Sequence, residues 1–289
     1  MSVEKIERVA VIGAGEMGQQ IALLCAKGGF PTHLHDQSEE ALEKAIHKLN
    51  QLTDRWIEKG KVTVEEREEM FARLIATTSI EEAVQSADLI IEAVVEKLEV
   101  KREVFQTLDR IAAQHTILAT NSSTIVSSKL ASVTKRPDRV LNMHFFYPPV
   151  VMDCIEIVKN EKTSQQTVDL VSQFCKEIGR TGIVIEKEIF GFIANRFVLA
   201  LTKEALHLYE GGYADYENID LIVKKALGHP LGPFELMDLS GLDVGYYVNV
   251  LQYEETGKEE DRPAQSVIDK IEKGELGRKT GKGWYDYTK

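Results

Sequence analysis

The sequence predicts an α/β domain built on a doubly wound parallel sheet, followed by a second domain that is all α. Two observations along the chain predict this order. Short apolar runs alternate with helical patterns as far as about residue 187, and only helical patterns follow. The 289 residues, 43% of them hydrophobic, also suffice for two domains of ~150 residues each. We therefore predict domains over residues 1–187 and 188–289.

The first predicted elements form a β-α-β unit with tight connections. Residues 8–13 are a short apolar run rich in β-branched side chains, which is typical of a strand. Residues 17–27 follow with a helical pattern that a glycine pair ends, and residues 32–35 predict the second strand. Residues 38–59 then predict a long helix.

The middle of the chain continues the alternation of strands and helices. The sequences from Thr63 to Glu66 and from Ser79 to Glu82 have the spacing of capping boxes, so each predicts a helix start. The apolar run over 89–95, which only Glu92 interrupts, predicts a strand buried on both faces. The other predicted elements are helices from 96 toward 113 and over 164–178, strands over 116–120, 140–145, 155–159 and 183–186, and helices alone from Gly191 onward.

The segment that joins the first strand to its helix has the G-x-G-x-x-G spacing of a dinucleotide-binding loop. It consists of Gly13, Ala14, Gly15, Glu16, Met17 and Gly18. In such loops the glycines allow a tight turn, close approach of a pyrophosphate and close packing of helix on strand. Asp36 ends the next strand, where its carboxylate would bind ribose hydroxyls and repel a 2′-phosphate. The sequence therefore predicts a Rossmann-type domain that binds NAD.

Polar side chains also follow two later strands. Residues 119–124 and 142–149 lie at the carboxyl ends of predicted strands, where ligands of open α/β sheets bind. His144 belongs to the second segment, and Glu156 lies in the next strand among apolar neighbours. A His–Glu pair would fix the tautomer of the imidazole, as a general base requires. From the residues alone, an ordinary core histidine remains the alternative for His144.

Nearly the whole chain resembles the 3-hydroxyacyl-CoA dehydrogenase family in its short, two-domain form, and most of all the bacterial 3-hydroxybutyryl-CoA dehydrogenases. The matching segments are 11–18, 91–96, 119–123, 143–146, 191–196, 228–235, 241–243 and 277–283. The resemblance implies reversible, NAD-dependent oxidation of a short L-3-hydroxyacyl-CoA to the 3-ketoacyl-CoA. It also implies a homodimer formed through the C-terminal domain.

The resemblance implies roles for particular residues. His144 would be the general base, and Glu156 would orient it. The other implied residues are Ser123 and Asn195 for the substrate, Lys59 for the CoA phosphates, and Glu96 and Lys101, beside Asp36 and the glycine loop, for the dinucleotide. The chain departs from the family pattern at Tyr147, which replaces Asn, at Asp153, which replaces Lys, and at Glu58 near the CoA lysine.

Charge and cysteine content exclude several other classes of protein. The 35 Lys and Arg residues against 46 Asp and Glu residues give a net charge of −11, which opposes binding to nucleic acid or to an anionic membrane. No apolar run approaches the ~18 residues of a membrane span. The three cysteines, Cys25, Cys154 and Cys175, form no C-x-x-C pair, so neither a metal site nor a disulfide framework is indicated. We expect a reduced, cytoplasmic protein.

Two other functions remain compatible with the sequence. The same fold could oxidise a free hydroxy acid or sugar acid instead of a CoA thioester. It could also bind NAD as a non-catalytic structural protein. The combination of Ser123, His144, Glu156 and Asn195 favours an enzyme over the second alternative.

Overall fold

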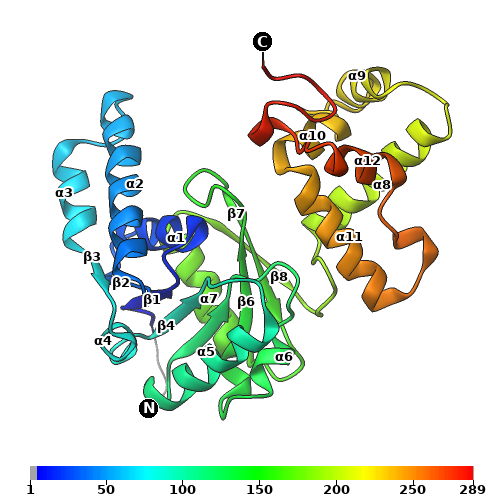
Figure 1. The fold of residues 1–289 in the computed structure, drawn as a ribbon. Coiled ribbons are helices and arrows are strands. Elements are labelled where there is room, and N and C mark those ends of the chain that lie inside the picture. Colours follow the sequence, from blue (N-terminus) through cyan, green and yellow to red (C-terminus); the bar gives the residue numbers. More distant parts are fainter. Residues whose placement is uncertain (1–4, 289) are drawn as a thin grey trace. The chain divides into compact units, whose positions relative to one another are not determined.

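The computed structural model describes residues 5–288, apart from the side chains of Glu255 and Glu260. The chain divides into two compact units, of which the first ends at Phe192 and the second begins at Ile193 (Figure 1). The predicted boundary between residues 187 and 188 lies slightly before this division.

An eight-stranded sheet forms the centre of the first unit (Figure 1). Its strands are β1 (Val9–Ile12), β2 (Thr32–His35), β3 (Leu74–Thr77), β4 (Leu89–Glu92), β5 (Ile117–Thr120), β6 (Val140–Phe145), β7 (Cys154–Lys159) and β8 (Thr181–Ile185). They lie in the order β3-β2-β1-β4-β5-β6-β7-β8, and only the β6–β7 pair is antiparallel. The strand order runs outward in both directions from β1 and β4, so the predicted doubly wound α/β fold is confirmed.

Successive side chains of a strand point to opposite faces, and helices cover both faces of the central strands. In β1, Val9 and Val11 pack into one apolar cluster, whereas Ala10 and Ile12 pack into the other. The first cluster is covered by α1 (Glu16–Lys27), α2 (Glu39–Glu58), α3 (Val64–Ala72) and α7 (Gln165–Glu177), and the second by α4 (Ile80–Val84), α5 (Leu98–Ile111) and α6 (Ser128–Ala131). A 3-10 turn, η1 (Pro137–Arg139), precedes β6.

The two predicted capping boxes have different outcomes. At α3 the box is complete, because the Thr63 hydroxyl accepts from the Glu66 N–H at 3.1 Å and the Glu66 carboxylate accepts from the Thr63 N–H at 2.7 Å. At α4 only half of the prediction is right. The Ser79 hydroxyl accepts from the Glu82 N–H at 3.2 Å, but the Glu82 carboxylate accepts from the Thr77 hydroxyl at 2.6 Å instead.

Other boundaries differ from the sequence prediction for local reasons. The edge strand β3 was not predicted, and the strand predicted over 89–95 ends at Glu92. The helix expected from Gly191 begins only at Ala194. Gly191 and Phe192 have φ angles of 73° and 48°, and this left-handed backbone cannot continue a right-handed helix.

Among its described residues the second unit contains helices and no β-strand, apart from isolated β-bridges between 277 and 286, so the predicted all-α domain is confirmed. Its elements are α8 (Ala194–Glu210), α9 (Tyr216–Leu227), α10 (Pro233–Ser240), α11 (Leu242–Thr256), η2 (Glu259–Asp261), α12 (Gln265–Glu272) and η3 (Arg278–Thr280). Its core is aromatic: the Phe234 and Trp284 rings meet edge to face, with centroids 4.6 Å apart. No helix in the described part of either unit is long and apolar enough to cross a membrane.

Candidate active site

The predicted site residues of the first unit, Lys59 excepted, gather at one edge of the sheet. The glycine loop follows β1, Asp36 follows β2, and Glu96 follows β4 after a short connection. Ser123 follows β5, and His144 lies near the end of β6. Since β2, β1, β4, β5 and β6 are parallel, all of these positions lie at their carboxyl ends (Figure 1). This is the edge outside which ligands of open α/β sheets bind.

The three glycines of the loop meet different surroundings. Gly13 has φ = 106°, and a Cβ there would lie 2.6 Å from the Ala93 carbonyl oxygen. A Cβ on Gly18 would lie only 1.8 Å from the Gly13 carbonyl oxygen, so any larger residue would push α1 away from the loop. Gly15 differs, because a Cβ there would meet nothing within 4 Å. The loop is thus closely packed at both ends and open in its middle.

Asp36 is hydrogen-bonded to the glycine loop. Its carboxylate accepts from the Ala14 N–H at 2.9 Å and from the Ser38 N–H at 3.0 Å, while the residue itself remains half-buried. The neighbouring loop residue Glu16 turns its side chain toward α2, where it forms an ion pair with Lys48. Asp36 is therefore fixed in direction, and the charge of Glu16 is balanced locally.

His144 and Glu156 face each other across the antiparallel β6–β7 pair. The imidazole Nδ1 lies 2.7 Å from a Glu156 carboxylate oxygen, and the two residues are only 6% and 3% exposed. The His144 ring also contacts the rings of Phe146 and Phe192, with centroids 4.6 and 5.6 Å away. An ionised carboxylate only accepts, so beside an ionised Glu156 the Nδ1 atom of His144 would carry the proton and Nε2 would not.

The loop after β5 is tied to the end of β6 by two asparagines. The Asn121 side chain accepts from the Phe145 N–H at 3.0 Å, next to His144. The Asn142 amide donates to the Ser122 carbonyl oxygen at 3.2 Å and to another loop carbonyl at 3.0 Å. These asparagines were not among the predicted site residues. Both nevertheless lie in the polar segments 119–124 and 142–149, whose place at strand ends the sequence already indicated as ligand-binding.

Glu96 holds the same loop from its other side. Its carboxylate accepts from the Ser122 hydroxyl, from the Thr124 hydroxyl at 2.9 Å, and from the Lys101 ammonium at 3.2 Å. Burial alone would raise the pKa of Glu96, but Lys101 and the two hydroxyls outweigh it and hold that pKa below its usual value. Lys101 itself is 1% exposed, so its ammonium lies beneath Glu96 and not at the surface.

Comparison with known proteins identifies this arrangement. The NAD binding domain of 3-hydroxyacyl-CoA dehydrogenase matches residues 8–189, and the C-terminal domain of the same enzyme matches residues 191–287. The chain belongs to the 3-hydroxyacyl-CoA dehydrogenase family. The resemblance that the motifs predicted is therefore confirmed, and NAD is the cofactor of this domain. The chain is an NAD-dependent oxidoreductase of this family.

Individual relatives extend over the full length. A probable 3-hydroxybutyryl-CoA dehydrogenase of Bacillus subtilis is 36% identical over 283 residues, which cover 98% of each chain. The crystal structure of (S)-3-hydroxybutyryl-CoA dehydrogenase from Ralstonia eutropha is 35% identical, with a TM-score of 0.93 over 99% of this chain and 100% of that one. A diketoreductase with dual catalysis of dicarbonyl compounds is 32% identical to this chain. Its structure has a TM-score of 0.89 over 99% of this chain and 100% of that one.

The first unit of this 3-hydroxyacyl-CoA dehydrogenase family member fits NAD. The open side of Gly15 exposes the start of α1, whose first N–H groups have no acceptor within the helix and favour an anion. The Asp36 carboxylate, already fixed by the loop, can accept from ribose hydroxyls. When bound, NAD supplies the hydride acceptor.

Three further residues that the sequence singled out take no part in the contacts described above. Lys59 is the exposed C-cap residue of α2. Tyr147, in the position of the family's Asn, is 62% exposed just after β6. Asn195 lies in the first turn of α8 and belongs to the second unit.

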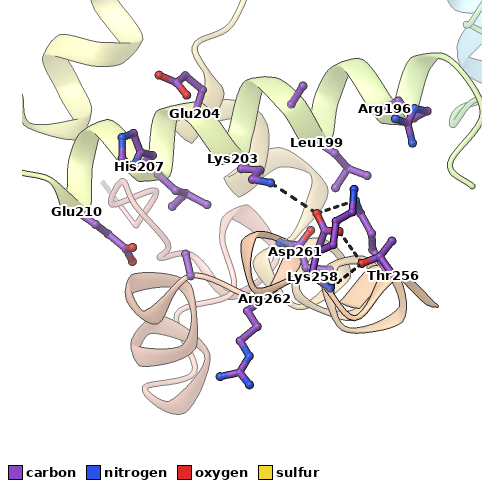
Figure 2. A pocket seen from close by; sticks show the side chains of 15 residues that line it. Arg196, Leu199, Lys203, Glu204, His207, Glu210, Thr256, Lys258, Asp261 and Arg262 are labelled. Carbon is purple, nitrogen blue, oxygen red and sulfur yellow. Dashed lines mark hydrogen bonds and ion pairs between the residues drawn. The ribbon is translucent and has the colours of Figure 1, made fainter. Parts of the chain in front are cut away.

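The second unit has a hollow of about 670 Å³ lined by α8, α11 and the segment around η2 (Figure 2). Its buried acid, Asp261, accepts from Gln252 at 3.0 Å and from Thr256 at 2.6 Å, and lies 3.6 Å from the Lys203 ammonium. Because residues that line the hollow already donate to the Asp261 carboxylate, we assign this acid a structural role. Among the described residues of both units, no three His, Cys, Asp or Glu side chains cluster as metal ligands would.

Proposed function

We propose that the protein catalyses the reversible oxidation of a short L-3-hydroxyacyl-CoA, such as 3-hydroxybutyryl-CoA, to the 3-ketoacyl-CoA with NAD. One observation carries the proposal: a buried His144–Glu156 pair, 2.7 Å between Nδ1 and carboxylate, stands at the same sheet edge as the dinucleotide loop. Family membership and the 3-hydroxybutyryl-CoA dehydrogenases among the relatives support the substrate class.

In this proposal His144 is the general base. Glu156 accepts the Nδ1 proton and so keeps Nε2 unprotonated, ready to take the proton of the 3-hydroxyl group. Positive charge develops on the imidazole as that proton arrives, and the adjacent carboxylate stabilises it. NAD accepts the hydride that leaves C3. In the reverse direction the protonated His144 returns the proton to the ketone oxygen.

In the same proposal, the remaining site residues bind the substrate and the dinucleotide and orient them. Ser123, held by its loop, and Asn195, in α8, hydrogen-bond the substrate. Lys59 meets the CoA phosphates as an exposed cation. The dinucleotide is bound by residues 13–18, Asp36 and Glu96, with Lys101 contributing through Glu96.

We also propose a cytoplasmic location and a homodimer formed through the second unit. Val244, Tyr247 and Leu251 follow one face of α11 and are 51%, 69% and 41% exposed, and Phe197 in α8 is 75% exposed. Apolar side chains at this helical spacing are typical of an interface. Light scattering tests this part, since a mass of one chain would contradict it.

A second candidate is the reduction of a dicarbonyl compound that carries no CoA. The similarity to a diketoreductase over the whole chain supports it.

The deciding experiment measures NADH oxidation with acetoacetyl-CoA, with free acetoacetate and with a free diketone, and repeats each with NADPH. We expect turnover on the CoA thioester to dominate and NADH to be preferred, because Asp36 disfavours a 2′-phosphate. Faster turnover of the diketone would favour the second candidate. NADH binding without turnover of any substrate would overturn both and leave a non-catalytic NAD-binding protein.

A further inference from the structure

Glu92, the acidic residue that interrupts the apolar run of β4, is fully buried. A buried carboxylate is costly unless donors surround it. Glu92 has three of them: the Lys101 ammonium, the Thr120 hydroxyl and the Val94 N–H, each at 2.7 Å. A neutral residue at this position would cost less free energy of folding, so stability alone does not explain why the residue is charged.

Lys101 connects Glu92 to the surface of the site. Its ammonium lies 2.7 Å from Glu92 and 3.2 Å from Glu96, and its side chain is 1% exposed. One cation therefore bridges two carboxylates, one buried and one at the sheet edge. Since Glu92 makes the shorter of the two contacts and cannot move within its strand, it fixes where the ammonium stands and thus where Glu96 is held.

Glu96 is hydrogen-bonded directly to the loop around Ser123, and Glu92 is connected to it through Thr120. Glu96 accepts from the hydroxyl of the preceding residue, Ser122, and from the N–H and hydroxyl of the following residue, Thr124, at 3.3 and 2.9 Å. The Thr120 hydroxyl, which donates to Glu92, accepts from the Ser122 N–H at 3.2 Å. Both neighbours of Ser123 are thus bonded to this chain of charges.

We propose that Glu92 is a positioning residue for the substrate contact of Ser123, acting through Lys101 and Glu96. The inference rests on the proposed function, because it takes Ser123 to hydrogen-bond the substrate. Glu92 does not touch substrate or cofactor. Its effect is to restrict the loop, and misplacement by ~1 Å of a group that orients substrate can cost ~10²-fold in rate.

The test compares Glu92→Gln with Asp88→Asn, a matched change at the other end of β4. Asp88 is also buried, and its carboxylate accepts from the Glu7 and Arg8 N–H groups at 2.9 Å each, remote from the site edge. With acetoacetyl-CoA and NADH, we expect Glu92→Gln to lower kcat about 10- to 100-fold per folded molecule. Asp88→Asn should lower thermal stability and leave kcat within about twofold.

A double-mutant cycle with Ser123→Ala shows whether Glu92 acts through Ser123. If it does, Glu92→Gln should lower kcat by no more than about threefold once Ser123 has been truncated, because the position to be held is already lost. A loss of kcat by the same factor in both backgrounds would overturn the proposal.

A measurement without substrate separates this inference from the proposed function. Hydrogen exchange of the amides of residues 120–125 should quicken in Glu92→Gln and stay unchanged in Asp88→Asn. If Glu92→Gln does not fold, the paired variant Glu92→Gln/Lys101→Met removes both buried charges, a change that buried ion pairs often tolerate. Unchanged exchange in this segment would overturn the positioning role, whereas a wild-type protein inactive on acetoacetyl-CoA would overturn only the proposed function.

Discussion

Both units of the molecule bury carboxylates, but they use them differently. In the second unit, Asp220 accepts from two main-chain N–H groups at the start of α10, at 2.8 and 3.0 Å. Asp238 accepts from the main-chain N–H groups of Trp284 and Tyr285, both at 2.8 Å. In the first unit, the buried Glu156 meets the side chain of His144, and Glu96, which is itself exposed, meets a buried lysine and two hydroxyls.

The type of partner differs between these two pairs of acids. Asp238 joins α10 to a segment more than forty residues away, and a bond to the main chain fixes that junction without leaving a proton to move. Glu156 instead bonds to Nδ1 of an imidazole, whose second nitrogen can serve as a donor or an acceptor. Burial alone would not separate Glu156 from Asp220 and Asp238, because all three are buried.

The largest effect that tests this distinction is expected at His144. His144→Gln should lower kcat about 10²- to 10⁴-fold, the usual contribution of a general base, with NADH affinity and melting temperature little changed. Steady-state rates with acetoacetyl-CoA, together with a fluorescence titration of NADH, measure both quantities.

The molecule offers a matched control at the opposite edge of the sheet. His115 also pairs with a buried carboxylate, since its Nε2 lies 3.1 Å from Asp88. His115→Gln should keep kcat within about twofold. Equal losses of activity in the two variants would mean that a His–carboxylate pair, wherever it lies, matters only for the fold.

The second effect is one of stability and belongs to the second unit. Asp238→Ala leaves two buried N–H groups and the Tyr287 hydroxyl without their acceptor, so the free energy of unfolding should fall by about 2–4 kcal/mol. Urea denaturation followed by Trp284 fluorescence, in a Trp56→Phe background, measures it. Asp269→Ala on the exposed face of α12 is the control, expected within about 0.5 kcal/mol of the parent. A loss of NADH affinity in Asp238→Ala would contradict a purely structural role.

The sequence predicted those parts of the site that depend on position along one strand. The glycine loop and Asp36 have fixed spacing within a β-α-β unit, and the contact between His144 and Glu156 follows from two neighbouring strands with polar residues facing each other. The roles of these residues remain proposals. The α/β and all-α order could also be predicted, because local patterns of apolar residues determine it.

What the sequence did not reveal depends on partners from other elements. Lys101 belongs to a helix with several charged residues, and only a carboxylate on β4 explains why its ammonium is buried. The edge strand β3 forms by pairing with the otherwise free edge of β2. The Glu82 carboxylate accepts from the Thr77 hydroxyl at the end of β3, in place of the main-chain N–H that a capping box requires. Such choices among competing partners are decided in three dimensions and leave little local pattern.

The smallest expected effect concerns pH and contrasts Glu96 with Asp220. The pKa of Glu96 lies below its ordinary value of 4.5, so ionised Glu96 stabilises the fold above that pH, and this stability is lost as the pH falls through the lowered pKa. The pKa of Asp220 is raised above 3.8, chiefly by burial, so its favourable contribution to stability is complete below 3.8 and is lost as the pH rises through the raised pKa.

Acidification should therefore narrow the difference in unfolding free energy between wild type and Glu96→Gln, and widen the difference between wild type and Asp220→Asn. Urea denaturation of the three proteins between about pH 6 and about pH 3.5 measures both gaps. Gaps that change in the same direction would show that the two carboxylates respond alike to pH, and the contrast between the two units would then not extend to the charge of their acids.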